Sequence, residues 1–209
     1  MKLILCRHGE TDFNTQKRLQ GKLETELNER GVKQARLVAE RLESDEFDCA
    51  FSSPQDRCRQ TASEIMRFHQ KTKMVFRNEL REIDLGKYTG MNPEEIEEKF
   101  PGEWGKRVDS KYEFLHEGGE SYKGVDEKRV KPLLKEFREK YSSRNVLVVT
   151  HQGIGRLIIG NLLGLAPGQK MKIDFPNECI YFIEYRPHKT EIRHCLAEEG
   201  IEGKGWLEK

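Results

Sequence analysis

Four consecutive apolar residues, Val146-Leu147-Val148-Val149, constrain the fold of this chain more than any other segment. A strand with one face in water would alternate apolar and polar side chains. An unbroken apolar run is instead typical of a strand that is covered on both faces. We therefore predict that residues 145–150 form a buried strand with other elements packed on either side.

Shorter apolar runs predict the remaining strands, and segments with apolar residues at helical spacing separate them. The predicted strands are 2–6, 49–52, 74–76, 179–185 and 190–196, and the predicted helices are 29–43, 54–69, 125–141 and 153–163. Pro132 is expected either to bend the third of these helices or to mark its start. Alternating helices and buried strands indicate an α/β fold, in which a mainly parallel sheet carries helices on both faces.

The chain departs from this alternation in two places. Residues 86–121 are rich in Gly, Pro, Glu and aromatic residues, and we predict that they form a small cap insertion that partly covers a site. The tail, residues 198–209, is rich in Gly and charge and is expected to be loosely held. A chain of 209 residues is long enough to bury one sizeable core, so we predict a single domain over 1–209.

Charge and cysteine content limit the partners and the compartment. Lys and Arg number 37 and Asp and Glu number 36, giving a net charge of +1, so no global field attracts nucleic acid or an acidic membrane. No apolar run approaches the roughly 18 residues that span a bilayer. The five cysteines include no CxxC pair, which indicates neither a disulfide framework nor a zinc site. We predict a cytoplasmic protein with neither nucleic acid nor a membrane as partner.

Arginine and histidine residues lie at or shortly after the ends of three of the predicted strands. Arg7 and His8 follow 2–6, Arg57 lies shortly after 49–52, and His151 follows 145–150. Ligands of open α/β sheets bind beyond the carboxyl ends of the strands. If these strands are parallel neighbours, two histidines and two arginines converge at one edge of the sheet.

Such a group is suited to a phosphoryl ester. Arg7 and Arg57 can each offer a planar fork to phosphate oxygens. A neutral imidazole can attack phosphorus to give a phosphohistidine, and a second, protonated histidine can stabilise charge on the oxygens. Main-chain N–H groups near Gly9 and Gly153 could donate as well. Because the arginines would repel a cation, no metal is expected, and no cofactor is needed.

Several segments in the same order resemble one known family. They are Leu5-Cys6-Arg7-His8-Gly9-Glu10-Thr11, Asn14, Gln20-Gly21, Ser52-Ser53 with Arg57, Leu80-Arg81-Glu82, Gly118-Gly119-Glu120-Ser121 and Thr150-His151-Gln152-Gly153. The chain resembles, over about residues 1–165, the histidine phosphatase superfamily, which has a phosphoglycerate-mutase-like fold. The segment 82–90 is more similar to the phosphatase-like branch than to the mutases.

This resemblance implies a role for each matching residue. His8 would be the phosphorylated nucleophile, and Glu82 the general acid that protonates the leaving oxygen and then activates water. The phosphoryl group would be gripped by Arg7, Arg57 and His151. The substrate side would be lined by Gly9, Asn14, Gln20, Gly21 and Gln152. The chain departs from the family at Pro54-Gln55, Cys58 and Gln152, which bear on substrate shape more than on activity.

We therefore predict a metal-independent phosphomonoester hydrolase that acts on a small phosphorylated metabolite through a phosphohistidine intermediate. One alternative is a 2,3-bisphosphoglycerate-dependent phosphoglycerate mutase, and a more remote one is a non-catalytic module that binds phosphate-bearing ligands. The presence of His8 and Glu82 argues against the binding module, because a binding module needs the cations but neither a nucleophile nor an acid. A homodimer could form through an exposed C-terminal edge strand. Substrate specificity is predicted to reside in Phe13, Leu19, Lys22 and the cap, whose aromatic residues could instead pack the cap itself.

Overall fold

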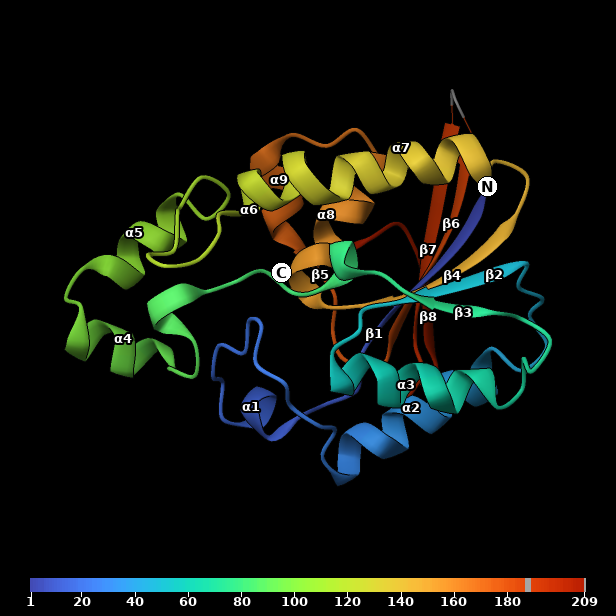
Figure 1. Ribbon diagram of the computed structural model, residues 1–209, viewed down its shortest axis with the longest axis horizontal. Helices are drawn as coiled ribbons and strands as arrows, with labels where there is room; N and C mark the ends of the chain where they lie inside the picture. Colours follow the sequence, from blue (N-terminus) through green and yellow to red (C-terminus); the bar gives the residue numbers. More distant parts are fainter. Residues whose placement is uncertain (187–188, 209) are drawn as a thin grey trace.

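A seven-stranded sheet in the order β3-β2-β4-β1-β6-β7-β8 forms the centre of the protein (Figure 1). The computed structural model describes residues 1–186 and 189–208. The strands of this sheet are β1 (Lys2–Arg7), β2 (Cys49–Ser52), β3 (Met74–Phe76), β4 (Asn145–Thr150), β6 (Cys179–Arg186), β7 (Lys189–Leu196) and β8 (Ile201–Lys204). The first four in the order are parallel neighbours, whereas β6 and β8 run in the opposite direction. The predicted α/β fold is confirmed, with β4 inside the sheet between β2 and β1.

Helices cover both faces of the sheet because its buried strands have two apolar faces. In β1, Leu3 and Leu5 contribute to one core cluster, and Ile4 and Cys6 contribute to the other, as the period of two in a strand requires. The first cluster lies beneath α7 (Lys131–Lys140) and α8 (Gln152–Leu162), and the second beneath α2 (Glu29–Arg41) and α3 (Asp56–Met66). Figure 1 shows these two helical layers on opposite sides of the strands.

The predicted helix 125–141 is divided into three parts in the structure. It consists of α6 (Tyr122–Val125), a π-helical turn (Asp126–Val130) and α7, which begins at Lys131 with Pro132 in its first turn. Pro132 therefore lies near the start of a helix, which is the second of the two roles expected of it. The remaining short elements are α1 (Asp12–Thr15), α9 (Pro167–Lys172), and the 3-10 helices Asn78–Leu80 and Gly86–Tyr88.

The cap segment, residues 86–121, contains α4 (Pro93–Lys99) and α5 (Glu103–Asp109), which stand away from the sheet at the left of Figure 1. Tyr88 contacts the rings of Phe100, Phe114 and His116 at centroid distances of 5.8 to 6.1 Å. Tyr88 and His116 are both buried. These aromatic side chains therefore pack the cap, which was one of the two roles that the sequence left open.

The tail is more ordered than the sequence suggested. In addition to β8, which pairs with β7, residues Leu207–Glu208 form β9, which pairs with β5 (Ile173–Asp174). The prediction of a loosely held tail was wrong for residues 201–208, because β8 and β9 pair with other strands and because Trp206 and Leu207 pack against the first core cluster. Lys209 lies outside the described residues. No helix in the described part of the chain is both long enough and apolar enough to cross a membrane.

Candidate active site

A cavity of about 360 Å³ opens beyond the carboxyl ends of β1 and β4 and extends beneath the cap. Eight of the ten predicted site residues line it. They are Arg7, His8, Asn14, Gln20, Gly21, Arg57, Glu82 and Gln152. The two others, Gly9 and His151, are the chain neighbours of His8 and Gln152 and do not line the cavity. The cavity is therefore where the sequence predicted a site.

Strand register brings the two histidines together. Arg7 of β1 pairs with Thr150 of β4, and the His8 N–H extends this ladder by donating to the Thr150 carbonyl at 3.1 Å. His8 and His151 are thus the first residues beyond two paired strand ends. Their ring centroids are 5.1 Å apart.

His8 has the electronic form that a nucleophile needs. Its Nδ1 lies 2.7 Å from the Gly9 carbonyl oxygen, which can only accept, so Nδ1 carries the proton and Nε2 keeps its lone pair. Burial, followed by the positive charges of Arg57 and Arg7, holds the pKa of His8 well below its usual range. The imidazole is therefore neutral and ready to attack an electrophile.

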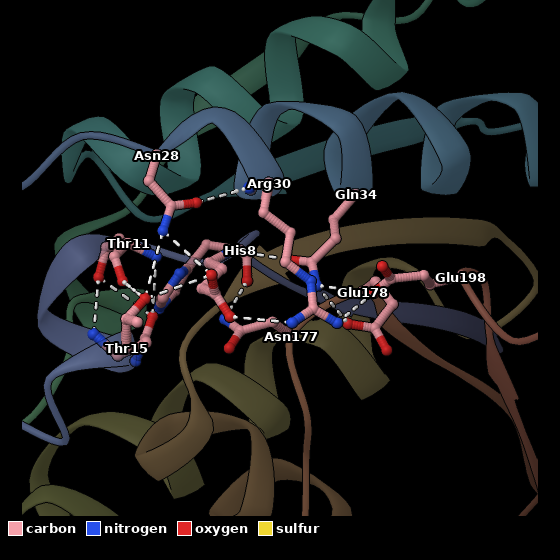
Figure 2. Close-up of polar contacts among 12 residues, drawn as sticks. His8, Thr11, Thr15, Asn28, Arg30, Gln34, Asn177, Glu178 and Glu198 are labelled. Carbon is pink, nitrogen blue, oxygen red and sulfur yellow. Dashed lines mark hydrogen bonds and ion pairs between the residues drawn. The ribbon is translucent and has the colours of Figure 1, made fainter.

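A polar network holds the backbone at His8 (Figure 2). The Asn177 side-chain amide donates to the His8 carbonyl at 2.8 Å, and the Glu10 N–H donates to Gln34 Oε1 at 2.8 Å. The other end of Gln34 donates to Glu178 at 3.0 Å. These contacts fix the backbone that follows the nucleophile, from the His8 carbonyl to the Glu10 N–H.

His151 is neutral in this structure, which corrects the expectation of an imidazolium. The Arg57 Nε–H donates to His151 Nδ1 at 3.3 Å, so Nδ1 is unprotonated, and Nε2 lies 2.8 Å from the Ser53 hydroxyl. Burial is the largest cause of a pKa well below the usual range for His151, and the Arg57 charge adds to it. Without a bound anion, the neighbouring cations disfavour a further positive charge on this ring.

Arg7 is a buried cation with donors available to a ligand. One Nη donates to the Phe175 carbonyl at 2.7 Å, and Nε has no hydrogen-bond partner among the described residues. Burial lowers the pKa of Arg7 to about 10, against the opposing effect of the Glu82 carboxylate. An anion in the cavity would relieve this cost of desolvation.

Arg57 corrects a second expectation, that of a fork directed mainly at phosphate. Its terminal nitrogens donate to the carbonyls of Leu23 at 2.7 Å and Gly21 at 3.0 Å, and to the Thr25 hydroxyl at 3.1 Å. Together with the bond to His151, these contacts use four of the five guanidinium N–H groups. Arg57 therefore braces the loop of residues 21–25 as well as lining the cavity.

Glu82 reaches the cavity from the loop that precedes the cap. Its carboxylate accepts from the Gly153 N–H at 2.9 Å and from the Ile83 N–H at 3.0 Å. A Cβ at position 153 would lie 2.3 Å from Glu82 Oε1, so glycine is required for this approach. The sequence indicated that N–H groups near Gly153 could donate to the phosphate, whereas in the structure the Gly153 N–H donates to the Glu82 carboxylate.

Gly9 also differs from its predicted role as a substrate-binding donor. Its N–H donates to the Thr61 hydroxyl at 3.1 Å, and a Cβ there would lie 2.3 Å from the Gly31 carbonyl oxygen. Glycine at position 9 thus allows the loop after β1 to pack closely against the start of α2. In this structure the Gly9 N–H is therefore hydrogen-bonded within the protein.

Only some of the predicted specificity residues line the cavity. Leu19 lines the cavity, as does Trp104 of the cap. Lys22 instead pairs with Asp84 at 3.1 Å, and Phe13 is not part of the cavity wall in the described structure.

Sequence reasoning missed a second group of cations. Arg107 of α5 and Arg156 of α8 are buried and line the cavity. Arg18 and Lys111 also line it but are not fully buried. Arg107 donates to His116 at 3.1 Å, whereas Arg156 Nε has no partner among the described residues. The sequence did contain a signal for Arg156, because it is a charged residue within the otherwise apolar run 154–159.

Comparisons with known proteins agree with this geometry. The family model of the histidine phosphatase superfamily (branch 1) matches residues 3–197. The chain is 38% identical over 165 residues to phosphoserine phosphatase 1 of Hydrogenobacter thermophilus, covering 79% of this chain and 77% of that protein. It is 33% identical over 210 residues to a metal-independent phosphoserine phosphatase of Arabidopsis thaliana, covering 100% of this chain and 86% of the relative.

A solved structure shares the fold. The α-ribazole phosphatase of Shigella flexneri superposes with a TM-score of 0.83 at 24% identity, covering 91% of this chain and 93% of the other. The chain belongs to the histidine phosphatase superfamily. Because its relatives are named phosphatases, the comparisons support a phosphomonoesterase over the mutase alternative.

Proposed function

We propose that this protein hydrolyses a small phosphomonoester through a phosphohistidine on His8, without a metal ion. The observation that carries the proposal is the neutral His8 imidazole, in which Nε2 is unprotonated. His8 lines the same cavity as Arg7 and Arg57. Among the described residues, neither arginine forms an ion pair with a carboxylate. Burial lowers the pKa of both, so a phosphate dianion would stabilise both cations.

The chemistry proceeds in two balanced steps. In the first, His8 Nε2 bonds to phosphorus, the ester P–O bond breaks, and Glu82 transfers its proton to the leaving oxygen. In the second, water attacks the phosphohistidine while the Glu82 carboxylate takes up one of its protons. The P–N bond breaks, inorganic phosphate leaves, and both side chains regain their starting forms. The cations Arg7 and Arg57 stabilise charge on the phosphoryl oxygens in both transition states.

The second group of cations favours a substrate with another anionic group. Arg156 is near enough to Arg7 and Arg107 that its charge lowers the pKa of both, although burial is the larger cause in each case. Three buried guanidinium groups, of which Arg156 repels both of the others, are suited to two separate anions. A phosphorylated hydroxy acid or amino acid such as phosphoserine, or a sugar bisphosphate, has this charge distribution. The names of the relatives from Hydrogenobacter thermophilus and Arabidopsis thaliana favour phosphoserine.

A cytoplasmic location is part of the same proposal. All five cysteines are free thiols, and Cys6, Cys58, Cys179 and Cys195 are buried. Burial raises the pKa of Cys58 to about 12, against the opposing effect of the Arg57 charge, which makes this thiol inert at neutral pH. Unpaired cysteines of this kind are typical of proteins from a reducing compartment.

A substrate panel in the presence of EDTA tests the proposed function. Phosphate release is measured with phosphoserine, 3-phosphoglycerate, fructose bisphosphates, α-ribazole phosphate and p-nitrophenyl phosphate, and 2-phosphoglycerate is assayed in the 3-phosphoglycerate tubes. We expect metal-independent phosphate release, with the highest kcat/KM for a substrate that carries a second anionic group. Isomerisation without net phosphate release, or activity only after metal addition, would overturn the proposal.

A further inference from the structure

Gln55 is a fully buried polar residue that the mechanism above does not use. It lies at the start of α3, and its side chain has no exposed surface. It is one of the positions at which the chain departs from the family pattern. A buried primary amide is costly unless its donors and acceptor are hydrogen-bonded, so its partners indicate what the residue does.

The two ends of the Gln55 amide bond to different parts of the active site. Oε1 accepts the Glu82 backbone N–H at 2.8 Å. Nε2 donates to the carbonyls of Gly21 and Leu23, each at 3.2 Å. One side chain therefore joins the loop of residues 21–25 to the backbone of the proposed general acid.

The two connections are not equally dependent on Gln55. The carbonyls of Gly21 and Leu23 also accept from Arg57, at 3.0 and 2.7 Å, so the loop of residues 21–25 keeps a strong donor without the amide. The Glu82 N–H donates to Gln55 and has no second acceptor among the described residues. Removing the amide should therefore release the Glu82 backbone far more than the loop.

The other contacts of Glu82 involve its carboxylate. The N–H groups of Gly153 and Ile83 hold the two oxygens, whereas Gln55 holds the main chain from which the side chain projects. The proton donor is thus fixed at both ends. A hydrophobic side chain at position 55 could fill the space but could not supply the acceptor.

We propose that Gln55 is a positioning residue that holds Glu82 in place to protonate the leaving oxygen. The inference rests on the proposed function, in which Glu82 is the general acid. Protonation matters most when the leaving group is a strong base and least when the departing oxygen is already stabilised. Loss of Gln55 should therefore slow substrates in proportion to the basicity of their leaving groups, whereas a general loss of structure would slow all of them alike.

The test compares phenyl phosphate with p-nitrophenyl phosphate, which differ in a nitro group that stabilises the departing phenolate. Values of kcat/KM are measured for the wild type and for Gln55→Met. Methionine has a similar size to glutamine but no hydrogen-bonding amide. Gln55→Leu is a second variant in case Gln55→Met folds poorly. We expect kcat/KM for phenyl phosphate to fall by about 10- to 100-fold, a cost typical of a displaced catalytic group. For p-nitrophenyl phosphate we expect a change of less than about threefold.

Two further variants make the outcomes distinct. Gln60 is a matched control because it lies on the same helix and its side chain accepts the Leu27 N–H at 2.7 Å, so Gln60→Met should change both substrates by the same factor. Glu82→Gln should show the full leaving-group dependence. If it does and the Gln55 variants slow both substrates equally, the positioning role is overturned and the proposed function stands. If Glu82→Gln lacks that dependence, Glu82 is not the general acid, and the proposed mechanism and this inference are both overturned.

Discussion

Replacing Arg156 by methionine should reduce activity selectively toward substrates that carry a second anion. Arg156 is 1% exposed, and its Nε has no partner among the described residues, so a bound anion would gain a charge-assisted hydrogen bond in a site with little water. Such a bond contributes about 1.5–3 kcal/mol, which corresponds to about 10- to 150-fold in kcat/KM. Methionine retains much of the apolar stem that packs in α8.

The assay compares kcat/KM for the best doubly anionic substrate of the panel with that for p-nitrophenyl phosphate. We expect the full loss for the first, expressed mainly as a higher KM, and a change of less than about threefold for the second. Thermal melting without phosphate is the control for folding, and removal of an unpaired buried charge should leave the melting temperature unchanged or higher. An equal loss for both substrates at an unchanged melting temperature would refute the assignment of Arg156 to a second anion.

Further predictions concern the Glu82 approach and a buried carboxyl behind the nucleophile. Gly153→Ala should lower kcat at least tenfold by displacing the Glu82 carboxylate. The control is Gly168→Ala, whose Cβ would meet nothing within 4 Å and which should leave kcat unchanged. Equal kcat values for the two variants would contradict the need for glycine at position 153. Burial and the Glu198 carboxylate raise the pKa of Glu178 from 4.5 to about 7, so the folded protein keeps a proton that the unfolded chain releases, and stability falls as pH rises across this interval. Glu178→Gln should therefore raise the melting temperature more at pH 8 than at pH 5, and an equal gain at both values would contradict the assignment.

The placement of the two histidines could be predicted from the sequence because it depends on strand ends. An unbroken apolar run fixes β4 as a central strand, and the residue that follows a parallel strand must lie at the edge of the sheet where ligands bind. His8 and His151 therefore needed no tertiary information beyond the pairing of β1 with β4. The fold class followed from the same pattern.

The protonation states and the directions of side-chain donors could not be predicted in this way. His151 is neutral because Arg57 points a donor at its Nδ1, and Arg57 is oriented by carbonyls of the loop of residues 21–25. These contacts join residues that are 36 and 94 positions apart in the chain, which no local pattern encodes. The strand β8 (Ile201–Lys204) was missed for a different reason. Its sequence, Ile-Glu-Gly-Lys, lacks an apolar face, and its order comes from backbone pairing with β7.

The central claim is that the phosphoryl group passes through His8, and trapping it there is the most direct test. The Glu82→Gln variant is mixed rapidly with p-nitrophenyl phosphate, and the reaction is quenched in alkali. The p-nitrophenolate leaving group needs little acid assistance, so His8 is still phosphorylated. The attack of water is slowed because the variant lacks the Glu82 carboxylate. Mass spectrometry should then find a phosphoryl group on the peptide that contains His8, and a burst of p-nitrophenolate should approach one equivalent per site. His8→Ala should show neither signal and no turnover. Normal turnover by His8→Ala, or phosphorylation at another residue, would contradict the mechanism.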